Sequence, residues 1–210
     1  MNKRFEQITA QLVSAAESFY RRGWMLGTSG NLSAVINEQP LHLAMTPSGV
    51  DKGAMGAEQI LIIDEHNRVI SGHASKPSDE APLHLRIVKD AGAAAVFHTH
   101  SVWSTMLSDL YSSDGGLAIE GYEMLKGLAG VKTHEHREWF PILENSQDMS
   151  TLAESVGGIL KERANTHGFL LRRHGLYTWG ADVTQAKRHI EIIEFLLETT
   201  GRTLLATKGH

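Results

Sequence analysis

The chain has 210 residues, of which 41% are apolar and 21% charged, and its formal net charge is −4. This composition is typical of a soluble globular protein with one domain, 1–210, and no Lys/Arg block exceeds two residues, which argues against a nucleic-acid partner. There is no membrane-length apolar run, no signal-peptide core at the N-terminus and no cysteine, so we expect a cytoplasmic protein without a membrane partner, in which histidines and carboxylates hold any metal.

Helix and strand signals alternate in the first half of the chain. Hydrophobic spacing and turn residues predict a helix over 3–22, strands over 32–36, 41–46, 60–63 and 68–70, and a helix over 80–90. Ser78 or Asp79 is expected to cap the second of these helices.

The second half continues the alternation and ends in a long helix. We expect a strand over 93–100, a helix over 102–110, a loop over 112–116, a short helix or turn over 120–127, a strand over 139–143, a helix over 149–164, strands over 168–173 and 176–179, and a helix over 183–205. This order predicts a mixed α/β domain with an antiparallel-rich sheet covered by helices.

The predicted strand over 93–100 ends in two histidines one residue apart. Residues two apart in a strand point to the same side, so His98 and His100 form half of a metal site, unless they are a chance pair on a half-solvated strand. His174, at the end of another predicted strand, would complete a zinc site of three imidazoles, although a lone histidine there is more often structural. Five other histidines occupy polar, loop-like segments typical of solvated side chains: His66, His73, His134, His136 and His210.

Three segments rich in glycine, serine and proline, 27–31, 46–49 and 77–79, are of a kind that binds anions. Glycines let backbone N–H groups converge, and the hydroxyl and amide side chains add donors. The third segment also opens a helix, whose N-terminus favours an anion. Each segment alone is more often a simple turn.

Two glutamates are candidates for acid–base chemistry. Glu80 follows the third of these segments, where a first-turn glutamate that complements the helix dipole is the ordinary explanation. Glu123 lies among glycines, where most glutamates are simply solvated. A carboxylate beside a metal-bound carbonyl is, however, what proton abstraction next to that carbonyl requires.

Taken in order, these motifs resemble those of the class II sugar-phosphate aldolases and adducin heads. The motifs are Gly27-Thr28-Ser29-Gly30-Asn31-Leu32-Ser33, Thr46-Pro47-Ser48-Gly49, Pro77-Ser78-Asp79-Glu80, His98-Thr99-His100 and Arg173-His174-Gly175. Two further segments, 122–127 and 171–180, look most like one branch of that superfamily, the methionine-salvage dehydratases that act on 5-methylthioribulose 1-phosphate.

The resemblance implies a single αβα domain with a mostly antiparallel central sheet covered by helices, and a homotetramer with its sites near subunit interfaces. It implies one zinc per subunit on His98, His100 and His174, with Glu123 as the acid/base and Glu80 as an additional ligand or base. The phosphate of a small phosphorylated keto-sugar would lie against Ser29, Gly30, Asn31, Ser48, Gly49 and Ser78.

The implied reaction is dehydration of 5-methylthioribulose 1-phosphate to 2,3-diketo-5-methylthiopentyl 1-phosphate. A class II sugar-phosphate aldolase or an epimerase is the alternative enzyme, because the same zinc-stabilised enolate would also serve retro-aldol cleavage of the C3–C4 bond. A non-catalytic adducin-like head is the alternative without chemistry, although such a head would be expected to lose metal ligands.

Overall fold

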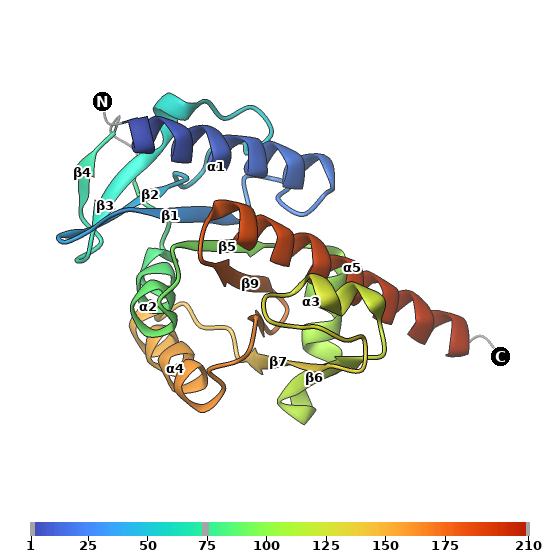
Figure 1. Cartoon of the computed structure of the whole chain (residues 1–210). Coiled ribbons are helices and arrows are strands. Elements are labelled where there is room, and N and C mark those ends of the chain that lie inside the picture. The colour runs from blue at the N-terminus through green and yellow to red at the C-terminus, as the bar shows by residue number, and fades with distance from the viewer. Residues whose placement is uncertain (1–2, 73–75, 209–210) are drawn as a thin grey trace.

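The computed structural model describes residues 3–72 and 76–208 (Figure 1). In this part of the chain, nine strands form one sheet in the order β4-β3-β2-β1-β5-β9-β8-β7-β6. The strands are β1 (Asn31–Glu38), β2 (Leu41–Met45), β3 (Leu61–Asp64), β4 (Val69–Ser71), β5 (Ala95–Thr99), β6 (Gly116–Glu120), β7 (Arg137–Leu143), β8 (Gly168–Leu171) and β9 (Gly175–Gly180). Strands β7 and β8 pair in parallel and the other described pairs are antiparallel, which confirms the predicted antiparallel-rich sheet.

Five α-helices and three short 3-10 helices complete the described residues. The α-helices are α1 (Lys3–Arg21), α2 (Ala81–Ala91), α3 (Val102–Leu110), α4 (Met149–Glu162) and α5 (Val183–Lys208), and the 3-10 helices are η1 (Ala57–Gln59), η2 (Ser112–Asp114) and η3 (Glu123–Gly127). Each of the predicted α-helices is present. Two expectations were wrong: Glu80, not Ser78 or Asp79, is the N-cap residue of α2, and β6 was not predicted.

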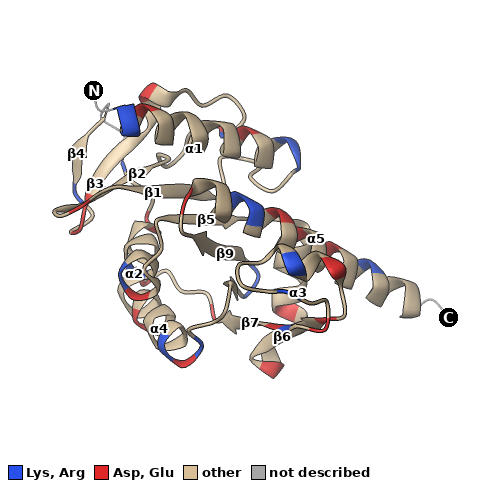
Figure 2. Ribbon diagram, in the orientation of Figure 1, with Lys and Arg blue, Asp and Glu red and all other residues tan. Residues whose placement is uncertain are grey.

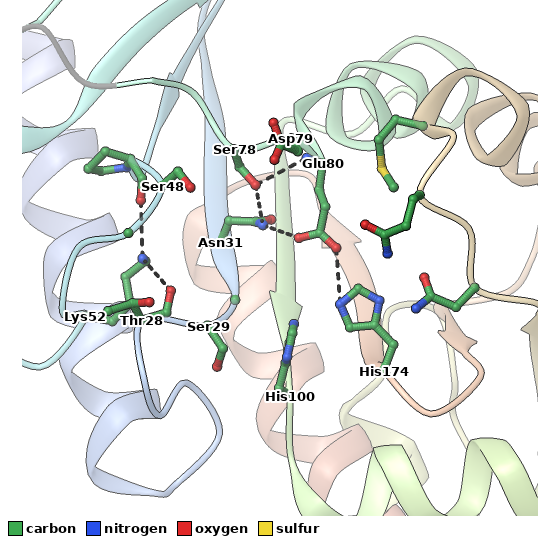
Figure 3. A pocket seen from close by; sticks show the side chains of 16 residues that line it. Thr28, Ser29, Asn31, Ser48, Lys52, Ser78, Asp79, Glu80, His100 and His174 are labelled. Atoms are coloured by element: carbon green, nitrogen blue, oxygen red, sulfur yellow. Dashed lines mark hydrogen bonds and ion pairs between the residues drawn. The ribbon is translucent and has the colours of Figure 1, made fainter.

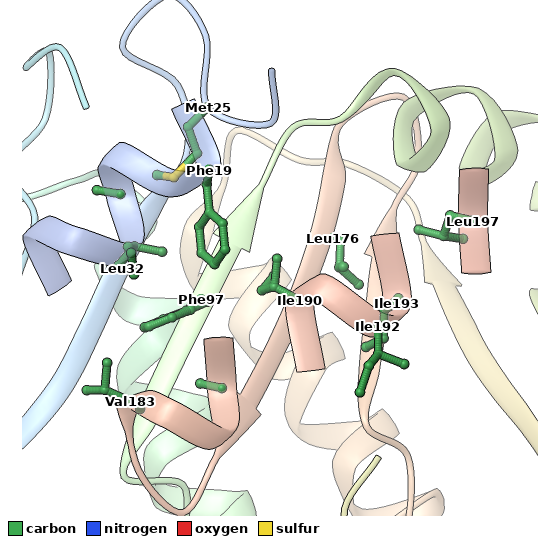
Figure 4. Packing of buried hydrophobic residues seen from close by; sticks show 14 of the residues in the cluster. Phe19, Met25, Leu32, Phe97, Leu176, Val183, Ile190, Ile192, Ile193 and Leu197 are labelled. Carbon is green, nitrogen blue, oxygen red and sulfur yellow. The ribbon is translucent and has the colours of Figure 1, made fainter. Parts of the chain in front are cut away.

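Alternation along β5 places its side chains in two separate apolar cores. Phe97 packs with residues of α1 and α5, such as Phe19 and Ile190 (Figure 4). Val96 packs in a second core with Ile87 of α2, together with residues of α4. Successive strand residues point to opposite faces, so these two cores lie on the two faces of the sheet.

Strand β5 lies between β1 and β9, and neither β5 nor β9 carries a charged residue. Figure 2 shows Lys, Arg, Asp and Glu mainly on the helices and connecting segments. Because β5 is buried on both faces, its residues before His98 form a continuous apolar run. Pairing on both edges makes the strand a rigid support for the histidines. The histidines at its end are therefore held on a strand that is paired on both edges and packed on both faces.

None of the helices in residues 3–72 and 76–208 is both long and apolar enough to cross a membrane. Of the histidines expected to be solvated, His66 and His134 have side chains 65% and 56% exposed, as predicted. His73 and His210 lie outside the described residues.

Candidate active site

Three histidine rings converge at one end of β5. His98 lies within the strand, His100 follows its end, and His174 lies in the turn between β8 and β9. The Nε2 atom of His98 is 2.7 Å from Nε2 of His100 and 3.3 Å from Nε2 of His174. The predicted same-side projection of the first two rings is confirmed, and the third ring arrives because β9 pairs with β5, placing Tyr177 opposite His98.

Two glycines allow neighbouring backbone to approach this end of β5. A Cβ atom at Gly175 would collide with the carbonyl oxygen of Thr99. A Cβ atom at Gly30, which has a φ of 70°, would lie only 2.8 Å from the carbonyl oxygen of His98. Glycine at these positions lets the turn with His174 and the segment before β1 close on the strand from its two sides.

The three rings are neutral, as metal ligands must be. Burial is the main cause, and the neighbouring His174 the next, of a pKa of His98 well below its usual range. Burial lowers the pKa of His100 to about 2. Burial also lowers the pKa of His174. Because Nδ1 of His98 lies 3.0 Å from the Leu176 carbonyl oxygen and donates to it, its Nε2 presents a lone pair to the other rings. Converging imidazole lone pairs in a buried position fit a divalent cation.

Glu80 brings a carboxylate against the histidines. Its Oε1 is 3.2 Å from Nε2 of His174 and 3.5 Å from Nε2 of His98. One ligand atom from each of Glu80, His98, His100 and His174 lies within 4.8 Å of the others, so these four residues form a group that could hold a metal ion. The expectation that Glu80 is an additional ligand or a base is consistent with this position.

A buried hydrogen-bonded chain orients Glu80 (Figure 3). The Nδ2 atom of Asn31 donates to Oε2 of Glu80 at 2.6 Å and to Oγ of Ser78 at 3.0 Å. Behind it, Oδ1 of Asn31 accepts from Nε2 of His84, whose Nδ1 lies 2.7 Å from Oγ of Ser33. Burial lowers the pKa of His84 to about 4, so the ring is a neutral link in this chain. The side-chain amide of Asn31 thus holds a carboxylate, a role that the sequence did not indicate.

A cavity of about 300 Å³ opens beside the histidines and collects the three predicted anion-binding segments. It is lined by Thr28, Ser29, Gly30, Asn31, Pro47, Ser48, Gly49, Lys52, Ser78, Asp79, Glu80, His100, Asn145, Gln147, Met149 and His174. Every residue expected to contact phosphate is in this lining, and three of them, Ser29, Ser48 and Ser78, bring hydroxyl groups. Asn145 and Gln147 come from the connection between β7 and α4, Met149 is the first residue of α4, and none of the three was singled out in the sequence.

Lys52 is the cation of this lining and was also missed. Only 1% of its surface is exposed, and its Nζ donates to the carbonyl oxygens of Val50 at 2.9 Å, Thr28 at 3.3 Å and Pro47 at 3.3 Å. Burial lowers the pKa of Lys52 to about 8, although Asp51 acts in the opposite direction. A buried ammonium group therefore ties the first two anion-binding segments together (Figure 3). A lysine three residues after the second segment was the available sequence signal.

Glu123 does not belong to the cavity of its own chain. It lies on η3 with 72% of its side chain exposed, and its Oε1 accepts from Nζ of Lys126 at 2.6 Å. This hydrogen bond is the main reason why the pKa of Glu123 is lowered. The structure of one chain therefore brings together the three histidines, Glu80 and the anion-binding segments, but not Glu123.

The sequence matches the family described as Class II Aldolase and Adducin N-terminal domain over residues 10–200, and the chain belongs to this family. Relatives point to one branch of it. The chain is 41% identical to the methylthioribulose-1-phosphate dehydratase of Pseudomonas aeruginosa, over 94% of this chain and 95% of that protein. It is 37% identical to the protein of the same name from Sorangium cellulosum, over 92% of this chain and 91% of that protein.

A solved structure confirms the fold. The L-fuculose-1-phosphate aldolase of Thermus thermophilus superposes with a TM-score of 0.76 at 20% identity, covering 97% of this chain and 98% of that one. The class II aldolase-like α/β fold implied by the resemblance is thus confirmed.

Proposed function

We propose that this protein dehydrates 5-methylthioribulose 1-phosphate to 2,3-diketo-5-methylthiopentyl 1-phosphate in methionine salvage. The observation that carries this function is the identity of 37% and 41% to two methylthioribulose-1-phosphate dehydratases over more than nine-tenths of the chain. The geometry supports it, because one cavity is lined both by Glu80, His100 and His174 of the candidate metal cluster and by the hydroxyl-rich segments that suit an anion.

We propose zinc as the metal, one ion per subunit, held by His98, His100 and His174. Imidazole nitrogens are preferred zinc ligands, and three of them leave a position for substrate. A zinc ion bound there would act as a Lewis acid on the substrate carbonyl and make the adjacent C–H group more acidic. Glu80 is the nearest carboxylate and would serve as a further ligand or orient the site.

The phosphate would lie in the recess formed by Ser29, Gly30, Asn31, Ser48, Gly49 and Ser78. The serine hydroxyls are suitable donors, whereas the side-chain amide of Asn31 is already bonded to Ser78 and Glu80. Lys52 adds positive charge at the junction of two recess segments, which favours a dianionic group. We therefore assign Asn31 mainly to orienting Glu80.

Glu123 is the proposed proton carrier. Its carboxylate would take the proton from C3, the electrons of that C–H bond would form a C2=C3 double bond, and the carbonyl electrons would move onto the C2 oxygen. As the C2 carbonyl re-forms, the double bond would shift to C3=C4 and the C4–O bond would break. The same carboxyl group would return its proton to the departing C4 hydroxyl, which leaves as water, and the C3 enol would ketonise. The proton count balances, and one water is lost for each substrate.

Because Glu123 is outside its own cavity, it would act in the site of a neighbouring copy of the chain. A homotetramer with sites near subunit interfaces provides this arrangement. Its high exposure and its place on a short 3-10 helix are compatible with insertion into a second subunit.

Mixed oligomers test this sharing directly. A His100→Ala subunit lacks a metal ligand and a Glu123→Gln subunit lacks the carboxylate, so neither variant should be active alone. Co-expressed, they should regain part of the wild-type turnover, because a site can combine intact histidines of one chain with Glu123 of the partner subunit. No recovery in verified mixed oligomers would reject the shared site.

An aldolase or an epimerase is the second candidate, and the position of Glu80 favours it. A carboxylate 3.2 Å from His174 could itself take a proton from a metal-bound substrate. Incubation with 5-methylthioribulose 1-phosphate separates the reactions, since dehydration gives a diketone of unchanged carbon number, retro-aldol cleavage gives two fragments, and epimerisation gives an isomer of unchanged mass.

A matched pair of variants then identifies the base. Glu123→Gln should keep zinc and lose turnover by roughly 10²–10⁴-fold, as for a lost general base. If Glu80→Gln instead loses turnover with zinc retained while Glu123→Gln remains active, the base is Glu80.

A further inference from the structure

A second cluster of titratable side chains lies away from the candidate active site. It consists of Glu138 on β7, His136 just before it, His167 just before β8 and His189 on α5, and we call it the Glu138 cluster. Its three histidines line a separate cavity of about 540 Å³. Glu138 is only 2% exposed and His189 only 3% exposed.

Glu138 is surrounded by hydrogen-bond donors. Its Oε2 is 2.7 Å from Nε2 of His136 and 3.0 Å from Nδ1 of His167, and its Oε1 accepts from the backbone N–H of His167 at 3.0 Å. Burial alone would raise the pKa of Glu138, but these bonds lower it. The buried carboxyl group is therefore ionised. His136, expected from the sequence to be merely solvated, is instead part of this cluster and has a side chain 34% exposed.

His167 and His189 have different proton arrangements. Both ring nitrogens of His167 face acceptors, because Nδ1 lies against Glu138 and Nε2 is 2.8 Å from the carbonyl oxygen of Ala129. The ring must therefore carry two protons to make both bonds. His189 donates from Nδ1 to the carbonyl oxygen of Trp179 at 2.7 Å, which leaves Nε2 as an acceptor. Burial lowers the pKa of His189 to about 4, consistent with a neutral ring.

These two histidines grip both polar groups of one residue. The Ala129 carbonyl accepts from Nε2 of His167, and the Ala129 N–H donates to Nε2 of His189 at 3.1 Å. We call this pair of hydrogen bonds the Ala129 clamp. The bonds to Ala129 need a protonated Nε2 on His167 and an unprotonated Nε2 on His189, and Glu138 adds the need for a second proton on His167, so a cationic His167 and a neutral His189 satisfy all of these bonds.

The clamp lies directly after η3, which carries Glu123. Ala129 is two residues beyond the end of η3. On the same segment Leu125 and Leu128 are buried, and Gly127 packs so closely on Ile192 of α5 that a Cβ atom there would collide with its side chain. The apolar contacts anchor residues 125–128 against the core, while the clamp fixes the orientation of the peptide groups on either side of Ala129.

We infer that His167 and His189 are positioning residues for Glu123, acting through the Ala129 clamp. This inference rests on the proposed role of Glu123. A proton carrier must reach its target atom within a fraction of an ångström, and displacement by about 1 Å can cost about 10²-fold in rate. If Glu123 acts in another subunit, no residue of its own active-site cavity fixes its position. The hydrogen bonds to Ala129, two residues after η3, would hold the segment in place instead.

The clamp also predicts a pH dependence. The titratable groups facing His167 are Glu138 and His136 on the β7 side and His189 on α5, with Arg188 near His189. Burial opposes the charge on His167, but Glu138 outweighs burial, so the pKa of His167 is raised. As the pH rises through the raised pKa of His167, one ring nitrogen loses its proton and the hydrogen bond to Ala129 or to Glu138 is lost.

Hydrogen–deuterium exchange tests the clamp without reference to activity. In metal-loaded His189→Ala, a peptide covering residues 123–131 should exchange faster than in the wild type, because the Ala129 N–H loses its acceptor. His189→Gln offers an acceptor at the position of Nε2 and should restore slow exchange. His136→Ala is the matched control, since His136 touches Glu138 but not Ala129. Unchanged exchange in folded His189→Ala would overturn the clamp.

Kinetics then test positioning. His189→Ala should lower kcat about 10- to 100-fold with KM and zinc content unchanged, and His189→Gln should recover most of it. His167→Gln cannot donate to both Glu138 and the Ala129 carbonyl, so it should lower kcat already at neutral pH and remove the further loss of activity that deprotonation of His167 causes in the wild type at higher pH. Faster exchange with wild-type kcat would overturn the positioning role. Full activity of Glu123→Gln would show separately that the proposed proton carrier was wrong, leaving the exchange result intact.

Discussion

Replacing Asn31 by alanine tests the buried chain that orients Glu80. The substitution removes a hydrogen bond to the Glu80 carboxylate and leaves the ring N–H of the fully buried His84 without its acceptor. A hydrogen bond to a charged group contributes about 1.5–3 kcal/mol, and an unsatisfied buried donor costs about 1–3 kcal/mol. Asn31→Ala should therefore lower the free energy of unfolding by about 2.5–6 kcal/mol.

For a chain of this length, each kcal/mol shifts Tm by about 2–4 °C, so the expected loss is roughly 5–24 °C. Thermal and denaturant unfolding of the metal-loaded protein measure it. Asn37→Ala is the control, because Asn37 lies on the same strand and its exposed side chain donates a hydrogen bond to the Pro40 carbonyl. It should cost less than about 1 kcal/mol.

The alternative role of Asn31 gives the opposite pattern. If its amide mainly binds the substrate phosphate, Asn31→Ala should raise KM while unfolding stays within about 1 kcal/mol of the wild type. That combination would refute the assignment of Asn31 to orienting Glu80.

Three further predictions concern the metal ligands, Lys52 and His167. Replacing His98 or His100 by alanine should abolish stoichiometric zinc by elemental analysis with the fold largely kept, and full zinc in both variants would reject the site. Lys52→Met should raise KM for the phosphorylated substrate about 10-fold or more, because a buried charge beside the recess is lost; an unchanged KM would separate Lys52 from phosphate binding. Because the pKa of His167 is raised in the folded protein, its pairing with Glu138 stabilises fully below the unfolded pKa of about 6.5 and is lost as the pH rises through the folded value; His167→Gln should flatten that part of the stability–pH curve measured by denaturant unfolding.

Local patterns were sufficient for much of the fold. Apolar periodicity identified α1, α4 and α5, and the paired spacing of His98 and His100 placed both rings on one side of β5. Strand β6 was missed because its residues, Gly116–Glu120, follow a glycine-rich stretch and have only a short apolar run. The helix cap at Glu80 was missed because the local rule favours Ser and Asp, whereas here the carboxylate is turned toward the histidines.

Site residues that depend on long-range packing were harder to predict. Lys52 was not singled out in the sequence, because the three carbonyl acceptors of its ammonium group come together only when the chain folds around it. His84 carried a weak local signal, since it lies one helical turn after Glu80. Glu123 is the opposite case: the resemblance to a family identified it from the sequence, but the structure of one chain does not bring it to the histidines.

The pairing of β5 with β9 also has a consequence for how the protein folds. His98 and His174 are 76 residues apart in sequence, and they meet only when this non-local strand pair has formed. Such pairings form slowly, because the intervening chain must lose entropy before the contacts compensate for it. We therefore expect the early folding species to bind metal weakly and the complete ligand set to assemble late. In refolding experiments, metal should speed the appearance of the native protein little and should mainly slow its unfolding.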